Sequence, residues 1–236
     1  MSVAENLRRL RSEVAEAAIR AGRSPDDITI VGISKTHSAE ELAEAVRAGL
    51  RHVGENRVQE AATKFPTAVA LLGADAAPPI FHLVGPLQTN KAGPAVKLFD
   101  RIDAVDSLKV AQALSRRLEG EAPLPILVEV YVGDDPRRPG VRPANLEEVL
   151  GGLLAVPGIR VEGLMTVAPL GGDARAAFNT VRELKDTLAR TFPVVHFGVL
   201  SMGMSEDFVD AIVEGSTEVR IGTAIFGPRQ SVGFLS

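Results

Sequence analysis

The chain has 236 residues, a formal net charge of −4 at pH 7 and 45% apolar residues. These values allow one large domain or two small ones and give no electrostatic reason to expect nucleic acid or an anionic membrane as a partner. The absence of cysteine excludes disulfides, thiolate zinc sites and thiol nucleophiles. No stretch resembles a signal peptide or is apolar for long enough to span a bilayer, so we expect a soluble, cytoplasmic protein.

The expected elements alternate regularly along the chain, starting with an amphipathic helix over residues 3–21. Apolar runs predict strands over 28–35, 52–54, 80–84, 101–105, 125–132, 160–166, 194–201 and 218–226. Helical spacing predicts helices over 39–48, 58–65, 91–98, 108–118, 145–155, 173–191 and 206–214. Ser38 and Glu41 have the spacing of a capping box, and Asn145 is the expected cap of the helix that follows it.

This alternation predicts an α/β fold, a single (β/α)8 TIM-type barrel with an extra N-terminal helix. A doubly wound open sheet is the alternative, but it usually has fewer strands and a glycine-rich turn after the first of them. Neither GxGxxG nor GxxxxGK[ST] occurs, so the sequence gives no support for dinucleotide or P-loop nucleotide binding. It also contains no HExxH motif, EF-hand loop or GxSxG elbow, and we expect no metal site.

Lys35 ends the first expected strand. A strand that is apolar on both faces lies inside a parallel sheet, so its end emerges among loops in a partly dry crevice. Desolvation there disfavours an ammonium ion, and the neutral amine is the species that attacks a carbonyl to give a Schiff base. The alternative interpretation is a strand-end lysine that simply reaches water.

In a barrel the carboxyl ends of the strands form the active face, whereas the amino ends serve stability. The expected carboxyl ends carry Lys35, Asn56, Gly85, Asp106, Tyr131, Thr166, Ser201, Met202, Arg220, Gly222 and Thr223. Three histidines, His52, His82 and His196, begin their expected strands at the opposite face, and we interpret them as structural. His37 lies at the functional face, although its position beyond Thr36 is also consistent with a side chain that points to solvent.

Two stretches at the carboxyl ends have the composition of anion sites. Residues 201–206 join the seventh strand to its helix, with Ser205 as the expected N-cap, and residues 220–223 include Gly222, which lets backbone N–H groups approach an oxyanion. Barrels commonly hold phosphate at the loops after strands seven and eight. Ordinary loop chemistry explains either stretch alone. Together with Lys35, the two stretches favour a ligand that carries both a phosphate and a carbonyl group.

Six segments, in this order, identify a family resemblance: VGISKTHSAEELAEAVRAG, HVGENRVQE, FHLVGPLQTNK, VEGLMTV, LSMGMSEDFVDAI and GSTEVRIGTAIFG. They closely resemble the pyridoxal phosphate homeostasis protein family (YggS/PROSC-like) over almost the whole chain. The resemblance implies a single domain over residues 1–236, a barrel related to the N-terminal domain of alanine racemase. It also implies that pyridoxal 5′-phosphate (PLP) is bound as an aldimine.

The resemblance assigns roles to individual residues. It makes Lys35 the aldimine lysine and implies that Ser205, Gly222 and Thr223 hold the phosphate. It places Arg220 opposite the pyridine nitrogen, and Asn56, Ser201 and Met202 along the pocket. One departure is visible, because the family usually has a lysine shortly before the glycine of the loop after strand five, where this chain reads Pro136-Arg137-Arg138-Pro139-Gly140. Arg138 keeps the charge there but does not form a Schiff base.

The resemblance favours a PLP-binding protein that stores, buffers or delivers the cofactor without substantial catalysis. PLP-dependent apoenzymes are the expected recipients, and we expect a monomer. A PLP-dependent racemase-like enzyme is the alternative, but racemases of this type complete their site with a base from a second domain, which we do not expect so close to the end of this chain. A Schiff-base aldolase acting on sugar phosphates is the third interpretation, and it rests on the barrel alone.

Overall fold

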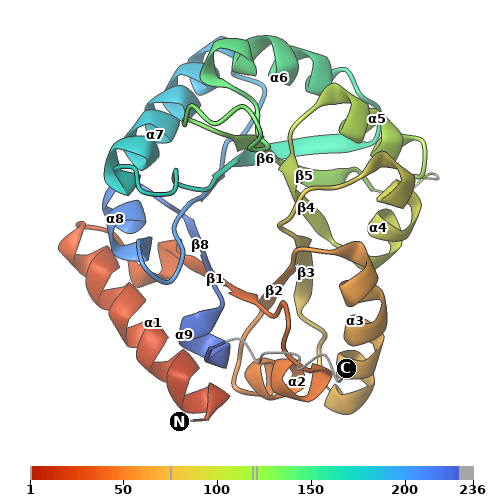
Figure 1. Cartoon of the computed structure of the whole chain (residues 1–236), viewed down its shortest axis with the longest axis vertical. Helices are drawn as coiled ribbons and strands as arrows, with labels where there is room; N and C mark the ends of the chain where they lie inside the picture. The colour runs from red at the N-terminus through yellow and green to blue at the C-terminus, as the bar shows by residue number, and fades with distance from the viewer. Residues whose placement is uncertain (1, 75, 119, 121, 229–236) are drawn as a thin grey trace.

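The computed structural model describes residues 2–228 except 75, 119 and 121. Parallel strands close into a barrel in chain order, and β8 pairs with β1 (Figure 1). The strands are β1 (Thr29–Ile33), β2 (His52–Glu55), β3 (Ile80–Leu83), β4 (Arg101–Val105), β5 (Leu124–Val130), β6 (Ile159–Thr166), β7 (Val199–Ser201) and β8 (Glu218–Ile221). The prediction of a (β/α)8 TIM-type barrel with an extra N-terminal helix is confirmed.

Helices surround the barrel, and α1 lies on its outside next to α8 and α9 (Figure 1). The helices are α1 (Val3–Arg20), α2 (Ala39–Arg47), α3 (Val58–Leu72), α4 (Ala92–Leu98), α5 (Leu108–Ser115), α6 (Leu146–Leu154), α7 (Ala174–Thr191), α8 (Phe208–Val213) and α9 (Thr223–Phe226). Among the described residues, the short 3-10 helices are η1 (Pro25–Asp27), η2 (Thr89–Lys91) and η3 (Pro143–Asn145). Within the described residues, no helix is long and apolar enough to cross a membrane.

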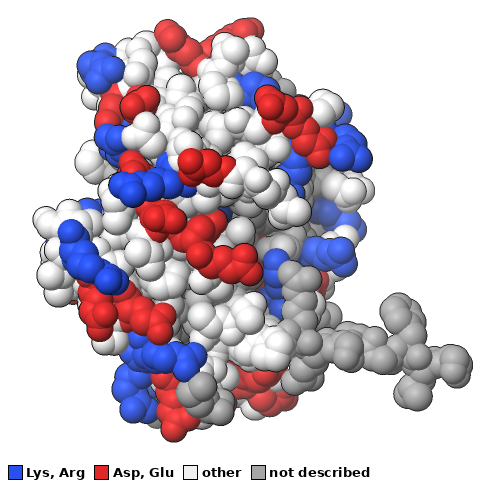
Figure 2. All heavy atoms as spheres, turned by 60° about the vertical axis from the view of Figure 1, so that its left-hand side comes forward, with Lys and Arg blue, Asp and Glu red and all other residues white. Residues whose placement is uncertain are grey.

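Local sequence signals explain much of this arrangement. Ser38 and Glu41 form the predicted capping box at the start of α2, and the apolar face of that helix, including Leu42 and Val46, is buried in the main core. That core lies between the strands and the surrounding helices. On the face of the molecule that Figure 2 brings forward, acidic and basic side chains are interspersed, as expected for a weakly charged chain.

Several expected boundaries differ from the structure, whereas the predicted cap position of Asn145 is confirmed. The helix α3 continues past Pro66 to Leu72, because a proline removes only one helical N–H and this helix lies on the surface. The strand β7 covers only Val199–Ser201, and β8 ends at Ile221 before the short helix α9. Asn145 occupies the cap position of α6 but makes no side-chain capping hydrogen bond.

Candidate functional site

The register of the barrel brings the loops after β1 and β2 together at the carboxyl ends of the strands. Ile33 of β1 pairs with Gly54 of β2, so Lys35 and Asn56 each lie two residues beyond a paired position. Both residues are half-buried. The strand β1 ends at Ile33 rather than at Lys35, which therefore lies in the loop and not in the strand as expected. The two residues occupy adjacent positions at the barrel mouth.

Arg220 is the best-fixed of the predicted site residues. It is buried, and its guanidinium donates to Ser201 Oγ at 2.8 Å and to the Thr166 carbonyl at 2.7 Å. Its own amide donates to the carbonyl of Gly203 at 3.0 Å. Burial lowers the pKa of Arg220. One cationic group therefore links β6, β7 and β8 just below the mouth, held in one orientation by side-chain and main-chain oxygens.

The start of α9 lies close to the end of β1. A Cβ atom on Gly222 would lie 3.2 Å from the Ile33 carbonyl oxygen, so this position favours glycine for its close approach to β1. Thr223 follows as the first residue of α9 and is exposed. Gly32 of β1 pairs with Ile221 of β8, which brings Gly222 and Thr223 next to the loop that carries Lys35.

The loop after β7 differs from the expectation in one respect. Met202 is buried, and its amide donates to the Glu218 carbonyl at 3.0 Å. Ser205 is half-buried but is not the N-cap of α8, so that prediction was wrong. Asp207 occupies the cap position, and its carboxylate accepts from the Met204 amide at 2.6 Å. This leaves Ser205 in the loop, two residues before the cap.

Glu129 is a buried carboxyl group that the sequence reasoning missed. Its neighbours Val128 and Val130 belong to the core outside the barrel, whereas Leu127 packs with Met165 inside it, so strand alternation directs Glu129 inward. Glu129 is 7% exposed, and its Oε2 has no hydrogen-bond partner among the described residues. A charged residue within an apolar strand run is the signal that marks it in the sequence.

The electrostatic surroundings of Glu129 favour its neutral form. Burial, reinforced by the Asp106 carboxylate, raises the pKa of Glu129 to about 7, while Arg220 and Arg138 act in the opposite direction. Perturbed carboxyl groups of this kind are concentrated at functional sites. The barrel mouth therefore contains a group that exchanges a proton near neutral pH.

Tyr131, the only tyrosine of the chain, follows β5 and is 6% exposed. The guanidinium carbons of Arg142 and Arg138 lie 4.5 Å and 5.8 Å from the centre of its ring. The loop at 133–140 folds back over it, and a Cβ atom on Gly133 would lie 2.3 Å from the tyrosine hydroxyl oxygen. The arginine that replaces the expected lysine in this loop thus covers an aromatic ring.

His37 does not point to solvent, so that reading was wrong. Its ring is buried, stacks on Phe226 with 5.1 Å between ring centres, and lies 3.3 Å from a carboxylate oxygen of Glu41. His37 thereby fixes the loop after β1 against α2 and α9. This contact joins the loop after β1 to the short helix α9 that follows β8.

A second buried charged cluster lies at the opposite end of the barrel. His52 Nδ1 is 2.9 Å from His82 Nε2, and His82 Nδ1 is 3.2 Å from Asp103 Oδ2. Arg101 donates two hydrogen bonds to Asp103, at 2.7 and 3.1 Å, and a third to Glu218. His52 and His82 are structural residues in this arrangement, as predicted, whereas His196 precedes β7 and does not begin it.

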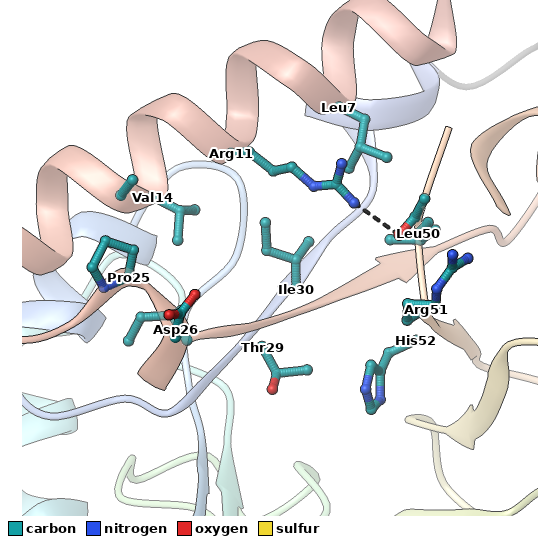
Figure 3. A pocket seen from close by; sticks show the side chains of 13 residues that line it. Leu7, Arg11, Val14, Pro25, Asp26, Thr29, Ile30, Leu50, Arg51 and His52 are labelled. Atoms are coloured by element: carbon teal, nitrogen blue, oxygen red, sulfur yellow. Dashed lines mark hydrogen bonds between the residues drawn. The ribbon is translucent and has the colours of Figure 1, made fainter. Parts of the chain in front are cut away.

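The possible ligand atoms of His82, Asp103 and Glu218 lie close enough together to bind a metal ion. However, both ring nitrogens of His82 already contact other residues, and the guanidinium of Arg101 bonds to the Asp103 and Glu218 carboxylates. Next to it, a cavity of about 370 Å³ opens between α1 and the amino ends of β1 and β2 (Figure 3). Leu7, Arg11 and His52 line it, and Arg11 donates across it to the Gly49 carbonyl at 2.8 Å. This cavity lies at the end of the barrel away from Lys35.

Comparisons with known proteins identify the family of this chain. The family described as alanine racemase, N-terminal domain, matches residues 2–230. Pyridoxal phosphate homeostasis proteins from Escherichia coli K12 and Aquifex aeolicus are 36% and 38% identical, over 96% and 98% of this chain and 97% and 100% of theirs. The chain belongs to the pyridoxal phosphate homeostasis protein family. Its sequence resemblance is thus confirmed.

Solved structures support the same assignment. The family member PipY of Synechococcus elongatus PCC7942, solved with PLP bound, is 36% identical with a TM-score of 0.83, covering 96% of this chain and 100% of that one. A protein of unknown function from Bifidobacterium adolescentis is 32% identical with a TM-score of 0.86, covering 94% of each chain. An alanine racemase from Corynebacterium glutamicum, 18% identical with a TM-score of 0.65, shares the fold; the alignment covers 94% of this chain and 59% of that one.

Proposed function

We propose that this family member binds PLP through Lys35 and acts in intracellular PLP homeostasis, by storage, buffering or delivery, without substantial catalysis. The observation that carries this proposal is the PLP-bound relative, which is 36% identical over 96% of this chain. The names of the curated relatives point in the same direction. A lysine, a buried arginine and a close-approach glycine at one end of the barrel are consistent with it.

The residues at the mouth fit such a ligand. Bound PLP supplies an aldehyde carbon that reacts with an amine. In this proposal Lys35 would provide that amine, and Arg220, which donates to Ser201 Oγ and to the Thr166 carbonyl, would face the pyridine nitrogen. A guanidinium does not give up its proton, so in this position it would leave the nitrogen unprotonated and would weaken the ring as an electron sink.

The phosphate end is assigned to the loops after β7 and β8. Ser205, Gly222 and Thr223 hold it in this proposal, and the absence of a side chain on Gly222 lets the backbone come close. Asn56 and Met202 are the further residues that this proposal assigns to the pocket. The phosphate contacts are independent of Lys35, so the proposal has two separable parts.

The alternative is a racemase-like enzyme, which needs acid/base groups at the substrate carbon. Tyr131, a natural candidate for such a group, is buried, and Arg142 covers its ring. This environment favours a structural role for the tyrosine, which supports a non-catalytic PLP-binding protein but leaves Glu129 as an acid/base group at the mouth. A single PLP-binding domain over residues 1–236, a cytoplasmic monomer and PLP-dependent apoenzymes as recipients remain predictions.

An absorbance spectrum of the purified protein with added PLP, before and after borohydride reduction, tests the proposal. We expect a yellow protein that is bleached on reduction, with the label on Lys35 after peptide mapping. Incubation with L- and D-amino acids in deuterium oxide then separates a carrier from an enzyme. Sustained exchange at the α-carbon over many turnovers would contradict the non-catalytic role, and absence of PLP label would contradict PLP binding.

A further inference from the structure

A buried lysine on α3 joins three elements directly around the loop that carries Lys35. Lys64 Nζ donates to the Ser34 carbonyl at 2.6 Å, to Glu55 Oε1 at 2.6 Å and to Glu60 Oε1 at 2.8 Å. Ser34 Oγ also donates to Glu55 Oε1, at 2.7 Å. We call Ser34, Glu55, Glu60 and Lys64 the Lys64 clamp. It connects the end of β1, the end of β2 and the first turns of α3.

The Lys64 clamp holds the chain on both sides of Lys35. The residue before it, Ser34, contributes its carbonyl and its hydroxyl to the clamp. The residue after it, Thr36, donates its amide to Glu60 Oε1 at 2.7 Å. The backbone of Lys35 is therefore fixed at both neighbours by one buried cation and its two carboxylate partners.

The loop held in this way is strained. Thr36 has a φ of 67°, and it is the single described residue other than glycine with positive φ. A β-branched residue in the left-handed region costs free energy, and such conformations persist only where surrounding contacts enforce them. Strain of this kind is concentrated at functional sites. The amide hydrogen bond from Thr36 to Glu60 supplies such a contact.

Burial strengthens the hydrogen bonds of the Lys64 clamp and makes the clamp sensitive to the loss of any charged partner. The side chains of Lys64 and Glu55 are 7% and 0% exposed. Burial raises the pKa of Glu55 although Lys64 and Ser34 donate hydrogen bonds to it. For Glu60, the hydrogen bonds from Lys64 and Thr36 outweigh its partial burial, and its pKa is lowered. Removal of the ammonium group would leave two carboxyl groups without their shared donor.

We propose that Lys64 is a positioning residue for Lys35, because its ammonium group fixes Ser34 and, through Glu60, Thr36, and so sets the direction of the Lys35 amine. This inference rests on the proposed function of Lys35 and adds a group outside the mouth that acts through the backbone. It separates two properties, since positioning affects how fast the amine reacts and not how tightly the phosphate is held.

The test compares Lys64→Met, which keeps the aliphatic stem, with the full-length wild-type protein. The rate of borohydride-trapped PLP label on Lys35 reports on positioning. Affinity for pyridoxine 5′-phosphate, which has the phosphate but no aldehyde, reports on the phosphate site. We expect Lys64→Met to lower the labelling rate on the order of ten- to a hundredfold, with affinity for pyridoxine 5′-phosphate unchanged within about threefold.

Two controls exclude a general loss of stability. Lys97→Met removes an exposed lysine from α4 and should leave both readouts unchanged. Asp103→Asn disrupts the cluster at the other end of the barrel and should lower the free energy of unfolding without changing the labelling rate of the folded protein. Should Lys64→Met fail to fold, Glu60→Gln replaces it, with an expected fall in rate of about threefold to tenfold.

The outcomes are distinct. If wild-type Lys35 takes no label, the proposed function fails and not only the positioning role. If wild-type Lys35 is labelled but Lys64→Met or Glu60→Gln reacts at the wild-type rate, the positioning role is overturned while PLP binding stands. An equal loss of labelling rate and of pyridoxine 5′-phosphate affinity would show a structural role and would also overturn it.

Discussion

The two ends of this barrel both bury charged side chains, but they treat them differently. At the amino end, Arg101 and His82 surround Asp103, and the pKa of this carboxyl is lowered well below its usual range; burial opposes the effect, but the charges of His82 and Arg101 outweigh it. At the carboxyl end, burial raises the pKa values of Glu55 and Glu129. The amino end thus keeps the Asp103 carboxylate charged and paired, whereas burial at the carboxyl end shifts the pKa values of two carboxyl groups upward.

This difference separates the groups that stabilise the fold from the groups that are strained or shifted in pKa at the candidate site. Paired charges at the amino end stabilise the fold, in keeping with the general role of that end in barrels. The carboxyl end contains a strained Thr36 and, among the described residues, oxygens of Glu55 and Glu129 that have no hydrogen-bond partner; at the amino end one oxygen of Glu218 also lacks a partner. Both features cost stability and are typical of binding sites. Substitutions at the two ends should therefore have opposite effects on stability and binding.

The largest expected effect is at Lys35. Lys35→Ala should abolish borohydride-trapped PLP label completely, while weak PLP binding remains because the phosphate contacts do not involve this residue. Thr223→Ala should weaken that residual binding. Equilibrium dialysis of PLP measures both variants, with Lys97→Ala as the matched lysine control. If Lys35→Ala loses all PLP binding and Thr223→Ala has no effect, the phosphate assignment is wrong.

The next effect is at the amino end. Asp103→Asn removes one of the two buried carboxylate partners of Arg101 and the hydrogen-bond partner of His82, so we expect the free energy of unfolding to fall by about 3–5 kcal/mol. Affinity for PLP should remain unchanged in the folded protein. Urea unfolding measures the first quantity, and Glu162→Gln, which disrupts the more exposed pair with Arg160, should cost less than about 1 kcal/mol. Loss of PLP affinity in Asp103→Asn would show that the two ends are coupled.

Sequence reasoning was strongest where the signal is local. Alternating apolar runs, together with a cap such as Ser38, predicted the order of the strands and helices, because each of these signals lies within a few residues. It failed at α9, where a four-residue helix starts directly after β8. The three apolar residues at 224–226 are equally typical of a strand and of a buried helical turn.

The site was predictable only in part, and the reason is physical. Strand-end residues such as Lys35 and Arg220 follow from the rule that barrels act at their carboxyl ends. The Lys64 clamp joins residues from three elements, and only the Glu60–Lys64 pair, four residues apart on one helix, is visible locally. Left-handed Thr36 has no sequence signal at all, since tertiary contacts enforce it.

The third effect in size is the pH dependence of stability, which should have opposite signs for Glu129 at the mouth and Asp103 at the amino end. The pKa of Glu129 is about 7 in the folded protein and near its ordinary value when unfolded, so the folded state binds more protons between about pH 4.5 and 7. Stability from this group is therefore present at low pH and lost as the pH rises to 7. Glu129→Gln should remove this loss. The difference in the free energy of unfolding between Glu129→Gln and the wild type should therefore be about 2–3 kcal/mol more favourable to the variant at pH 8 than at pH 4.5.

Asp103 provides the opposite sign. Its pKa is lowered on folding, so its contribution is present above the unfolded value and is lost as the pH falls. Urea unfolding of the wild type and Glu129→Gln at pH 4.5, 6 and 8 gives the slope for Glu129. The slope for Asp103 lies at lower pH, and unfolding of the wild type and Asp103→Asn between about pH 2.5 and 4.5 measures it. A stability difference between Glu129→Gln and the wild type that is the same at all three values would contradict the perturbed carboxyl group at the mouth.

The smallest expected effect tests the strain directly. Thr36→Gly removes the Cβ atom that disfavours a φ of 67°, so the free energy of unfolding should rise by about 1 kcal/mol even after the extra chain entropy of glycine. The same substitution at Thr29, in the strand β1, should instead lower it by about 0.5–1 kcal/mol. Thr36→Gly should nevertheless slow the labelling of Lys35 severalfold, because a freer backbone holds the amine less firmly. If the strain at Thr36 serves to position Lys35, the Thr36→Gly variant should be more stable than the wild type and react more slowly. A Thr36→Gly variant that is less stable would show that the left-handed turn carries no strain to release.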